Sequence, residues 1–208
     1  MRVRVRRWWW ALSQLVILMF GITLWRLRAF GLRNIPRKGG FLLASNHQSY
    51  LDPPLVAACL PGEMHFMARR SLFKNPALRA IIVRCNAFPI ERDTADVKGV
   101  KEAIVRLGAG KILLVFPEGT RTRNGSIGPM KSGVGTLAER AAVPIVPVLI
   151  EGAHEVWPKG AILPRMGRIR IVFGKPFRLD RDTDAGARIR DAVAGLKGEL
   201  PGCRIASS

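Results

Sequence analysis

Short apolar runs that alternate with amphipathic stretches after residue 40 restrict the fold of this chain more than any other feature. Residues 97–107 and 189–196 carry apolar side chains at helical spacing. Alternating strand and helix patterns are typical of an α/β domain, in which helices cover a sheet. We therefore expect a central, mostly parallel or mixed sheet flanked by helices. The expected strands are 41–45, 65–68, 86–90, 111–116, 144–150 and 168–174.

The division of the chain follows from its composition. A length of 208 residues suits one domain with a sizeable core. The sequence RNIPRKGG is rich in proline, glycine and charge, which is typical of a linker, and it precedes the first expected strand. We expect residues 1–33 to form an N-terminal basic and apolar segment and residues 34–208 to form the globular domain.

The N-terminal segment contains an apolar run, residues 8–25, that holds no charged side chain. As a helix this run is roughly 27 Å long, just short of a comfortable bilayer span. Arginines flank both ends, and no cleavage site for a signal peptide follows. Indole rings favour the membrane interface, and tryptophans occupy both ends of the run: Trp8, Trp9, Trp10 and Trp25. These features favour a membrane-associated helix; the alternative is a helix buried in the core.

The charge balance indicates an anionic partner. The chain has 34 lysines and arginines against 15 acidic residues, a formal net charge of +19. Such an excess suits nucleic acid or an anionic membrane surface; solubility is the alternative reason, but it rarely needs so large a charge. No zinc finger, KH loop or aromatic RNP pattern is present, and the tryptophans lie in the apolar run. We expect anionic membrane lipids as partners and no nucleic acid.

The cysteines do not indicate a disulfide framework or a metal site. There are three of them, Cys59, Cys85 and Cys203, and none forms a CxxC pair. Their number and spacing fit a reducing compartment. Histidine and aspartate also show no ligand cluster, so we expect no bound metal.

The heptapeptide NHQSYLD, residues 46–52, directly follows the first expected strand. A turn through it can bring Asp52 back onto the ring of His47. A carboxylate in that position fixes the tautomer of an imidazole that acts as a general base. The alternative is that Asp52 merely caps a helix whose first turn contains Pro53 and Pro54. The two carboxylate oxygens could also share both roles, so we expect capping as a compatible second role of Asp52.

A second polar motif, FPEGTRTR at 116–123, begins where the strand 111–116 ends. Glu118, Arg121 and Arg123 crowd around Gly119; guanidinium groups bind phosphate in bidentate fashion, and glycine permits close backbone approach. An ordinary charged loop is the alternative. Ligands of open α/β sheets gather at the carboxyl ends of strands, so this motif and NHQSYLD could meet in one cleft. Arg92, in FPIER, is another candidate phosphate contact.

The ordered blocks NHQSYLD, FPIER, FPEGTRT and VPIVPV resemble the four blocks of the PlsC-like 1-acylglycerol-3-phosphate acyltransferases, across about residues 40–150. The resemblance implies that His47 is the general base and Asp52 its orienting partner. It places Arg92, Glu118, Gly119 and Arg121 in the acceptor and phosphate site. Further expected substrate-binding positions are Asn46, Ser49, Lys131 and Pro147, the last in a block associated with the acyl donor.

The implied reaction is transfer of an acyl group from acyl-CoA or acyl-carrier protein to lysophosphatidic acid, which forms phosphatidic acid for phospholipid biosynthesis. No metal or redox cofactor is implied. The expected location is the inner cell membrane, with the catalytic domain on its cytoplasmic face. A related acyltransferase that uses another lysolipid or an acylated amino-lipid is the first alternative. A non-catalytic membrane-binding protein is the second, and the sequence leaves the oligomeric state open.

Overall fold

The structure, a computed structural model, describes residues 2–91, 96–179 and 184–200 and is built on one seven-stranded sheet. The strand order is β1-β7-β6-β2-β5-β3-β4, and every neighbouring pair is parallel except β6 and β7. The expected mixed α/β fold is confirmed, and β1 is an additional edge strand. The strands are β1 (Arg28–Phe30), β2 (Phe41–Ser45), β3 (Met64–Arg69), β4 (Ala87–Ile90), β5 (Ile112–Val115), β6 (Ile145–Glu151) and β7 (Arg170–Phe173).

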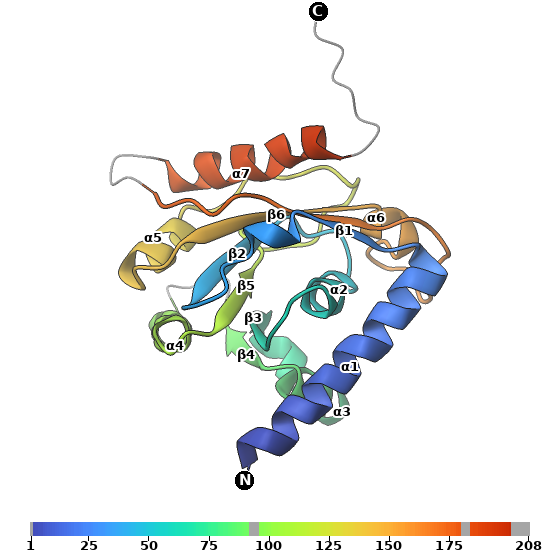
Figure 1. The fold of residues 1–208 in the computed structure, drawn as a ribbon, viewed down its shortest axis with the longest axis horizontal. Helices are drawn as coiled ribbons and strands as arrows, with labels where there is room; N and C mark the ends of the chain where they lie inside the picture. Colours follow the sequence, from blue (N-terminus) through green and yellow to red (C-terminus); the bar gives the residue numbers. More distant parts are fainter. Residues whose placement is uncertain (1, 92–95, 180–183, 201–208) are drawn as a thin grey trace, which may run out of the picture.

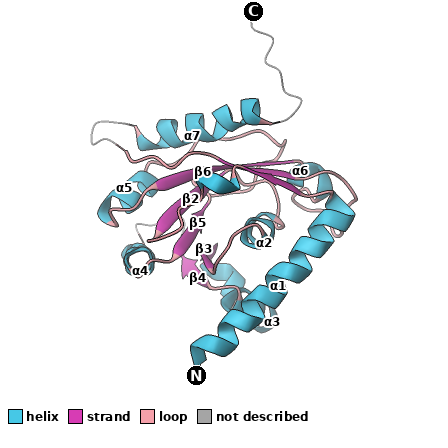
Figure 2. Cartoon of the chain, in the orientation of Figure 1, coloured by secondary structure: helices cyan, strands magenta, loops and turns pink. Residues whose placement is uncertain are grey.

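Helices cover both faces of this sheet, as the ribbons in Figures 1 and 2 show. Side chains of α1 and α2 share one apolar cluster with the sheet, and α4, α5 and α7 contribute to a second cluster on the other face. The α-helices are α1 (Arg2–Trp25), α2 (Asp52–Ala58), α3 (Pro76–Arg84), α4 (Val97–Gly108), α5 (Gly133–Arg140), α6 (Ala153–Val156) and α7 (Ala185–Gly195). Three short 3-10 helices are Leu32–Asn34, Arg70–Phe73 and Leu196–Glu199.

One face of α1 packs on α2, whereas most of the helix is exposed (Figure 1). Trp10 and Trp25 are buried, and Nε2 of Gln14 donates to the carbonyl oxygens of Ala57 and Leu60 at the end of α2. Only 17% of the span Trp8–Trp25 is buried, which disfavours a core helix. By length and composition this helix is able to cross a membrane. Its exposed apolar side chains are Trp8, Trp9, Leu12, Leu15, Val16, Met19, Phe20, Ile22 and Leu24.

The strand directions bring distant segments to one edge of the sheet. The carboxyl ends of β2, β3, β5 and β6 lie together because these strands run parallel. Since β7 runs antiparallel to β6, and β1 parallel to β7, the first residues of β1 and β7 lie at that same edge. We call it the carboxyl edge. NHQSYLD follows β2 and FPEGTRTR follows β5, so both motifs begin at this edge, as the sequence predicted.

Candidate active site

Asn46 fixes the point at which the chain leaves β2. Its Nδ2 donates to the carbonyl oxygen of Ile150, and its Oδ1 accepts from the Ile150 amide, both at 2.8 Å. The side-chain amide thus continues the ladder between β2 and β6 by one position. This contact holds the start of the NHQSYLD turn, and with it the backbone of His47, at the carboxyl edge.

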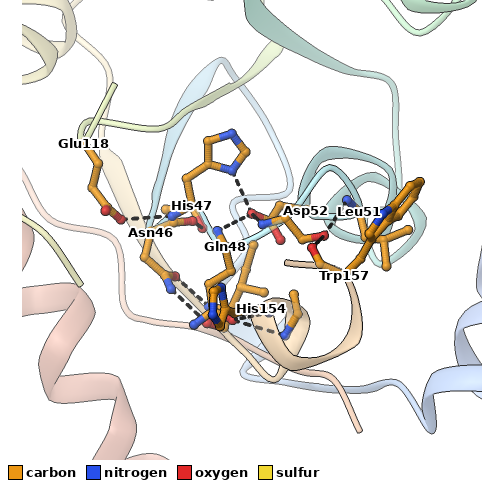
Figure 3. Close-up of polar contacts among 12 residues, drawn as sticks. Asn46, His47, Gln48, Leu51, Asp52, Glu118, His154 and Trp157 are labelled. Carbon is orange, nitrogen blue, oxygen red and sulfur yellow. Dashed lines mark hydrogen bonds and ion pairs between the residues drawn. The ribbon is translucent and has the colours of Figure 1, made fainter. Parts of the chain in front are cut away.

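His47 and Asp52 form a buried pair (Figure 3). The distance from Nδ1 of His47 to Oδ2 of Asp52 is 2.7 Å, and Asp52 is fully buried. The same oxygen accepts from the amides of Gln48 at 2.6 Å and Ser49 at 2.8 Å, so the turn itself holds the carboxylate. With Nδ1 directed at Asp52, Nε2 is the ring nitrogen left to meet a substrate.

The expected capping role of Asp52 is wrong. α2 begins at Asp52 itself, and the N-cap position is Leu51, which makes no side-chain capping bond. The carboxylate points back into the preceding turn because His47 and the amides of Gln48 and Ser49 together occupy its Oδ2 atom. The first turn of a helix tolerates proline, because its amides have no intrahelical partners. With Pro53 and Pro54 there, α2 starts without a side-chain cap from Asp52.

The loop after β5 packs against the histidine, so the structure brings the two motifs together. The rings of His47 and Phe116 stack with centroids 3.9 Å apart and an interplanar angle of 17°. The amide of His47 donates to Oε1 of Glu118 at 2.9 Å, and the amide of Thr122 donates to the carbonyl oxygen of His47 at 2.8 Å. Ring and backbone of His47 are therefore both fixed by the FPEGTRT loop.

Glu118 is a half-buried carboxylate that organises this loop. Its Oε2 accepts from the amide of Gly128 at 3.2 Å, in addition to the bond from His47. Burial raises the pKa of Glu118, and the negative charge of Asp52 adds to that rise, while the two amide donors oppose it. Glu118 thus positions the histidine backbone rather than its ring.

Two further side chains of the turn tie it to the segment after β6. The Oγ of Ser49, which is buried, donates to the carbonyl oxygen of Trp157 at 2.9 Å. Oε1 of Gln48 accepts from the amides of Ala153 and His154 at the start of α6, at 3.1 and 3.2 Å. Sequence reasoning did not single out Gln48, although it lies within NHQSYLD; only the fold places α6 opposite it.

Arg121 packs against the NHQSYLD turn. Its guanidinium stacks 3.5 Å above the ring of Tyr50, and its Nη1 is buried with no hydrogen-bond partner among the described residues. Such a donor suits an anionic ligand, because an unsatisfied buried N–H is costly. A pocket of about 320 Å³ adjoins it, lined by Glu118, Thr120, Arg121, Thr122, Arg123, Ser126, Gly128, Pro129 and Lys159.

The remaining predicted site residues are less central. Gly119 has φ +71°, a left-handed conformation that favours glycine, and the side-chain end of Lys131 lies beside it. The Lys131 amide donates to the carbonyl oxygen of Pro117 at 3.1 Å. Pro147 is buried within β6 opposite Ala44, away from the pocket lining. Arg92 lies outside the described residues.

Over the described parts of the chain, no three His, Cys, Asp or Glu side chains gather as metal ligands. Cys59 and Cys85 are free thiols, and Cys203 lies outside the described residues. Burial raises the pKa of Cys59 to about 12, so this thiol stays protonated and unreactive at neutral pH.

Comparisons with known proteins agree with this geometry. The sequence model of the Acyltransferase family matches residues 26–151, which include both motifs. The chain is 30% identical to 1-acyl-sn-glycerol-3-phosphate acyltransferase of Bacillus subtilis over 152 residues, 73% of each chain. It is 32% identical to the protein of that name from Streptococcus pneumoniae over 139 residues, 66% of this chain and 50% of the other.

A solved structure is similar in fold as well. The 1-acyl-sn-glycerophosphate (LPA) acyltransferase PlsC of Thermotoga maritima superposes with a TM-score of 0.82 and is 25% identical. The match covers 97% of this chain, so it includes most of α1, and 84% of the other. The motifs, their meeting at the carboxyl edge and these similarities lead to one conclusion: the chain belongs to the Acyltransferase family.

Proposed function

We propose that the chain is a 1-acyl-sn-glycerol-3-phosphate O-acyltransferase, which transfers an acyl group to lysophosphatidic acid and forms phosphatidic acid. The observation that carries this proposal is the buried His47–Asp52 pair next to a pocket that contains Arg121. Relatives from Bacillus subtilis and Streptococcus pneumoniae bear the name of this activity. The acyl donor is a thioester, either acyl-CoA or acyl-carrier protein, and the reaction uses no metal or redox cofactor.

The proposed chemistry is direct transfer between two bound substrates. Nε2 of His47 takes the proton of the free glycerol hydroxyl as its oxygen attacks the thioester carbonyl. Asp52 accepts from Nδ1–H and stabilises the imidazolium that forms. Collapse of the tetrahedral intermediate expels the thiolate, which takes up the proton from Nε2. General-base catalysis of this kind accounts for roughly 10² to 10⁴ in rate.

The acceptor phosphate is proposed to bind at Arg121. Its buried Nη1 supplies a charge-assisted donor, and the neighbouring positive charges of Arg123 and Lys159 favour an anion in the same pocket. Arg92 is proposed as a second phosphate contact on the basis of its motif. Positioning the phosphate fixes the distance between the acceptor hydroxyl and His47, which is itself a large part of such catalysis.

Attachment to the inner face of the cell membrane is part of the proposal. The exposed apolar surface of α1 and the net charge of +19 suit a bilayer that carries anionic phospholipids. An acceptor drawn from that bilayer need not move its acyl chain through water. The catalytic domain is proposed to lie on the cytoplasmic side, where acyl-CoA and acyl-carrier protein are found.

Product analysis tests the reaction. Purified protein is incubated with labelled acyl-CoA or acyl-carrier protein and, in separate assays, with lysophosphatidic acid, neutral monoacylglycerol, other lysolipids and acylated amino-lipids. We expect labelled phosphatidic acid as the main product. If lysophosphatidic acid is ignored while another acceptor is acylated, the proposed substrate is wrong. If no acceptor is acylated with either donor, the proposed enzyme activity is wrong.

A further inference from the structure

The connection between α6 and β7, residues 158–168, presents apolar side chains to solvent. Ile162, Leu163 and Met166 are 89%, 75% and 78% exposed. Three large apolar side chains this exposed within five positions are unusual on a soluble surface and indicate a contact with an apolar partner. We call this segment the apolar loop. These three apolar side chains have no part in the proposed chemistry.

The apolar loop is fixed to the end of α1. The amide of Ile169 donates to the carbonyl oxygen of Trp25 at 2.9 Å, and Nε1 of Trp25 donates to the carbonyl oxygen of Arg165 at 3.1 Å. These bonds hold the loop beside the last turn of α1. Ile22 and Leu24 of that turn are exposed. The exposed apolar surface of α1 is therefore continued by a segment about 140 residues away in sequence.

A pocket of about 290 Å³ lies where the apolar loop enters the sheet. Its lining is Arg26, Arg28, Phe30, Arg168 and Arg170, which we call the arginine pocket. Arg170 pairs with Glu151 at 3.4 Å, but the other three arginines form no ion pair with a described residue. Four guanidinium groups around one hollow repel one another, and an anion with several oxygens relieves that repulsion by accepting from them.

Both features lie at the carboxyl edge. Arg28 and Arg170 begin β1 and β7, and the strand next to β7 ends at Glu151. At its other end, the apolar loop contributes Lys159 to the pocket that also contains Glu118 and Arg121. The loop thus runs from the substrate pocket to the arginine pocket along a single edge of the sheet.

We propose that the apolar loop and the arginine pocket form a membrane-docking surface. Ile162, Leu163 and Met166 enter the acyl-chain region of the bilayer, and the arginines bind phosphates of anionic phospholipids. Together with α1 this gives the domain a second point of contact and turns the carboxyl edge toward the lipid. The inference deepens the proposed membrane attachment, but it does not depend on which acceptor is acylated.

Depth of insertion is the first test. An environment-sensitive fluorescent amino acid is placed at position 163, or at position 105 on α4 as a control, since Val105 is also exposed, at 66%. The protein is mixed with phosphatidylcholine–phosphatidylglycerol vesicles whose acyl chains are brominated. We expect quenching at 163 and little at 105. Equal quenching at both positions, none at 163 on vesicle-bound protein, or a failure to bind vesicles would each overturn the proposal.

The second test removes positive charge from the arginine pocket. It measures co-sedimentation of the protein with the same anionic vesicles at limiting lipid, without acyl substrates. A basic residue near an anionic surface strengthens binding about 5-fold, so R28Q/R168Q should bind such vesicles about 25-fold more weakly. The control K38Q/K111Q removes the same charge from exposed lysines that precede β2 and β5, at the opposite edge of the sheet. Equal weakening in both variants, or none in the first, contradicts the proposal. Vesicle binding is measured without catalysis, so its result does not depend on whether the proposed acyl transfer is correct.

Discussion

At the scale of single residues, one carboxylate oxygen organises the site. Oδ2 of Asp52 accepts from Nδ1 of His47 and from two amides of the same turn, and these bonds offset part of the cost of burying the carboxylate. The HxxxxD spacing predicted this pairing, because five residues suffice for a turn. The spacing could not exclude a role of Asp52 as a helix cap, because an aspartate followed by two prolines is also typical of the start of a helix. The structure distinguishes the two roles, because the carboxylate points to His47 and the preceding turn.

Arg121 is expected to act on the acceptor phosphate. Loss of a charge-assisted hydrogen bond costs about 1.5 to 3 kcal/mol, so Arg121→Gln should lower kcat/KM for lysophosphatidic acid by roughly 10- to 150-fold. The loss for neutral monoacylglycerol should be much smaller. Arg123→Gln is the matched control, because Arg123 lines the same pocket but is exposed. An equal loss on both acceptors would remove the phosphate role of Arg121.

Glu118 makes the stability depend on pH. Burial raises its pKa in the folded state, so between the ordinary pKa and the raised one the folded state binds the proton more tightly than the unfolded state. The free energy of unfolding of the wild type should therefore rise, relative to Glu118→Gln, as the pH falls through that window. Urea unfolding of both proteins from pH 7 to pH 4 measures this difference. A difference that shrinks on acidification would contradict the assigned cause.

At the scale of elements, α1 is joined to the domain by side chains of its inner face. Nε2 of Gln14 donates to the carbonyl oxygens of Ala57 and Leu60 at the end of α2, where the regular hydrogen-bond ladder of the helix stops. The apolar pattern of residues 8–25 predicted a helix but not this polar contact. A single glutamine in an apolar run gives no indication of which carbonyls it will meet 43 and 46 positions later.

Gln14→Ala should lower the free energy of unfolding by about 1 to 3 kcal/mol, because the carbonyl oxygen of Leu60 loses its side-chain donor, whereas that of Ala57 keeps the amide of Leu60. Ser13→Ala is the control. Among the described residues the Ser13 hydroxyl donates to the carbonyl oxygen of Trp10 within α1 alone, so its loss should have a much smaller effect. Denaturant unfolding in detergent micelles compares the two variants. If Ser13→Ala is as destabilising as Gln14→Ala, the loss of the contact between α1 and α2 does not explain the effect of Gln14→Ala.

The strands were predictable where apolar runs are long and buried. β2, β5 and β6 are almost entirely buried, and their sequences are continuous apolar runs. β1 could not be predicted, since Arg28–Phe30 is short and half exposed and becomes a strand only by pairing with β7. Tertiary contact, rather than local preference, determines such an edge strand.

At the scale of the whole molecule, the strand directions gather the substrate pocket, the apolar loop and the end of α1 at one edge. The two motifs predicted this in part, because each follows a strand in sequence. The contribution of residues 158–168 could not be predicted, since it depends on the antiparallel entry of β7. The arginines at 26, 28, 168 and 170 likewise become one cluster only through the pairing of β1 with β7.

The tryptophans of α1 report on its contact with lipid. Trp8 and Trp9 are 77% and 59% exposed, whereas Trp10 and Trp25 are buried against the domain. If α1 lies in a bilayer, brominated acyl chains should quench much of the tryptophan emission, and the W8F/W9F variant should lose most of that quenching. Quenching that is unchanged in the variant would mean that the outer face of α1 does not contact the acyl chains.

The central claim is that His47 is the general base of acyl transfer. Its most direct measurement is the rate of phosphatidic acid formation by His47→Gln, with His154→Gln as the control, a histidine of α6 near the same turn (Figure 3). We predict a loss of roughly 10² to 10⁴ in kcat for His47→Gln and a change within a few-fold for His154→Gln. A correctly folded His47→Gln protein that retains full turnover would contradict the account.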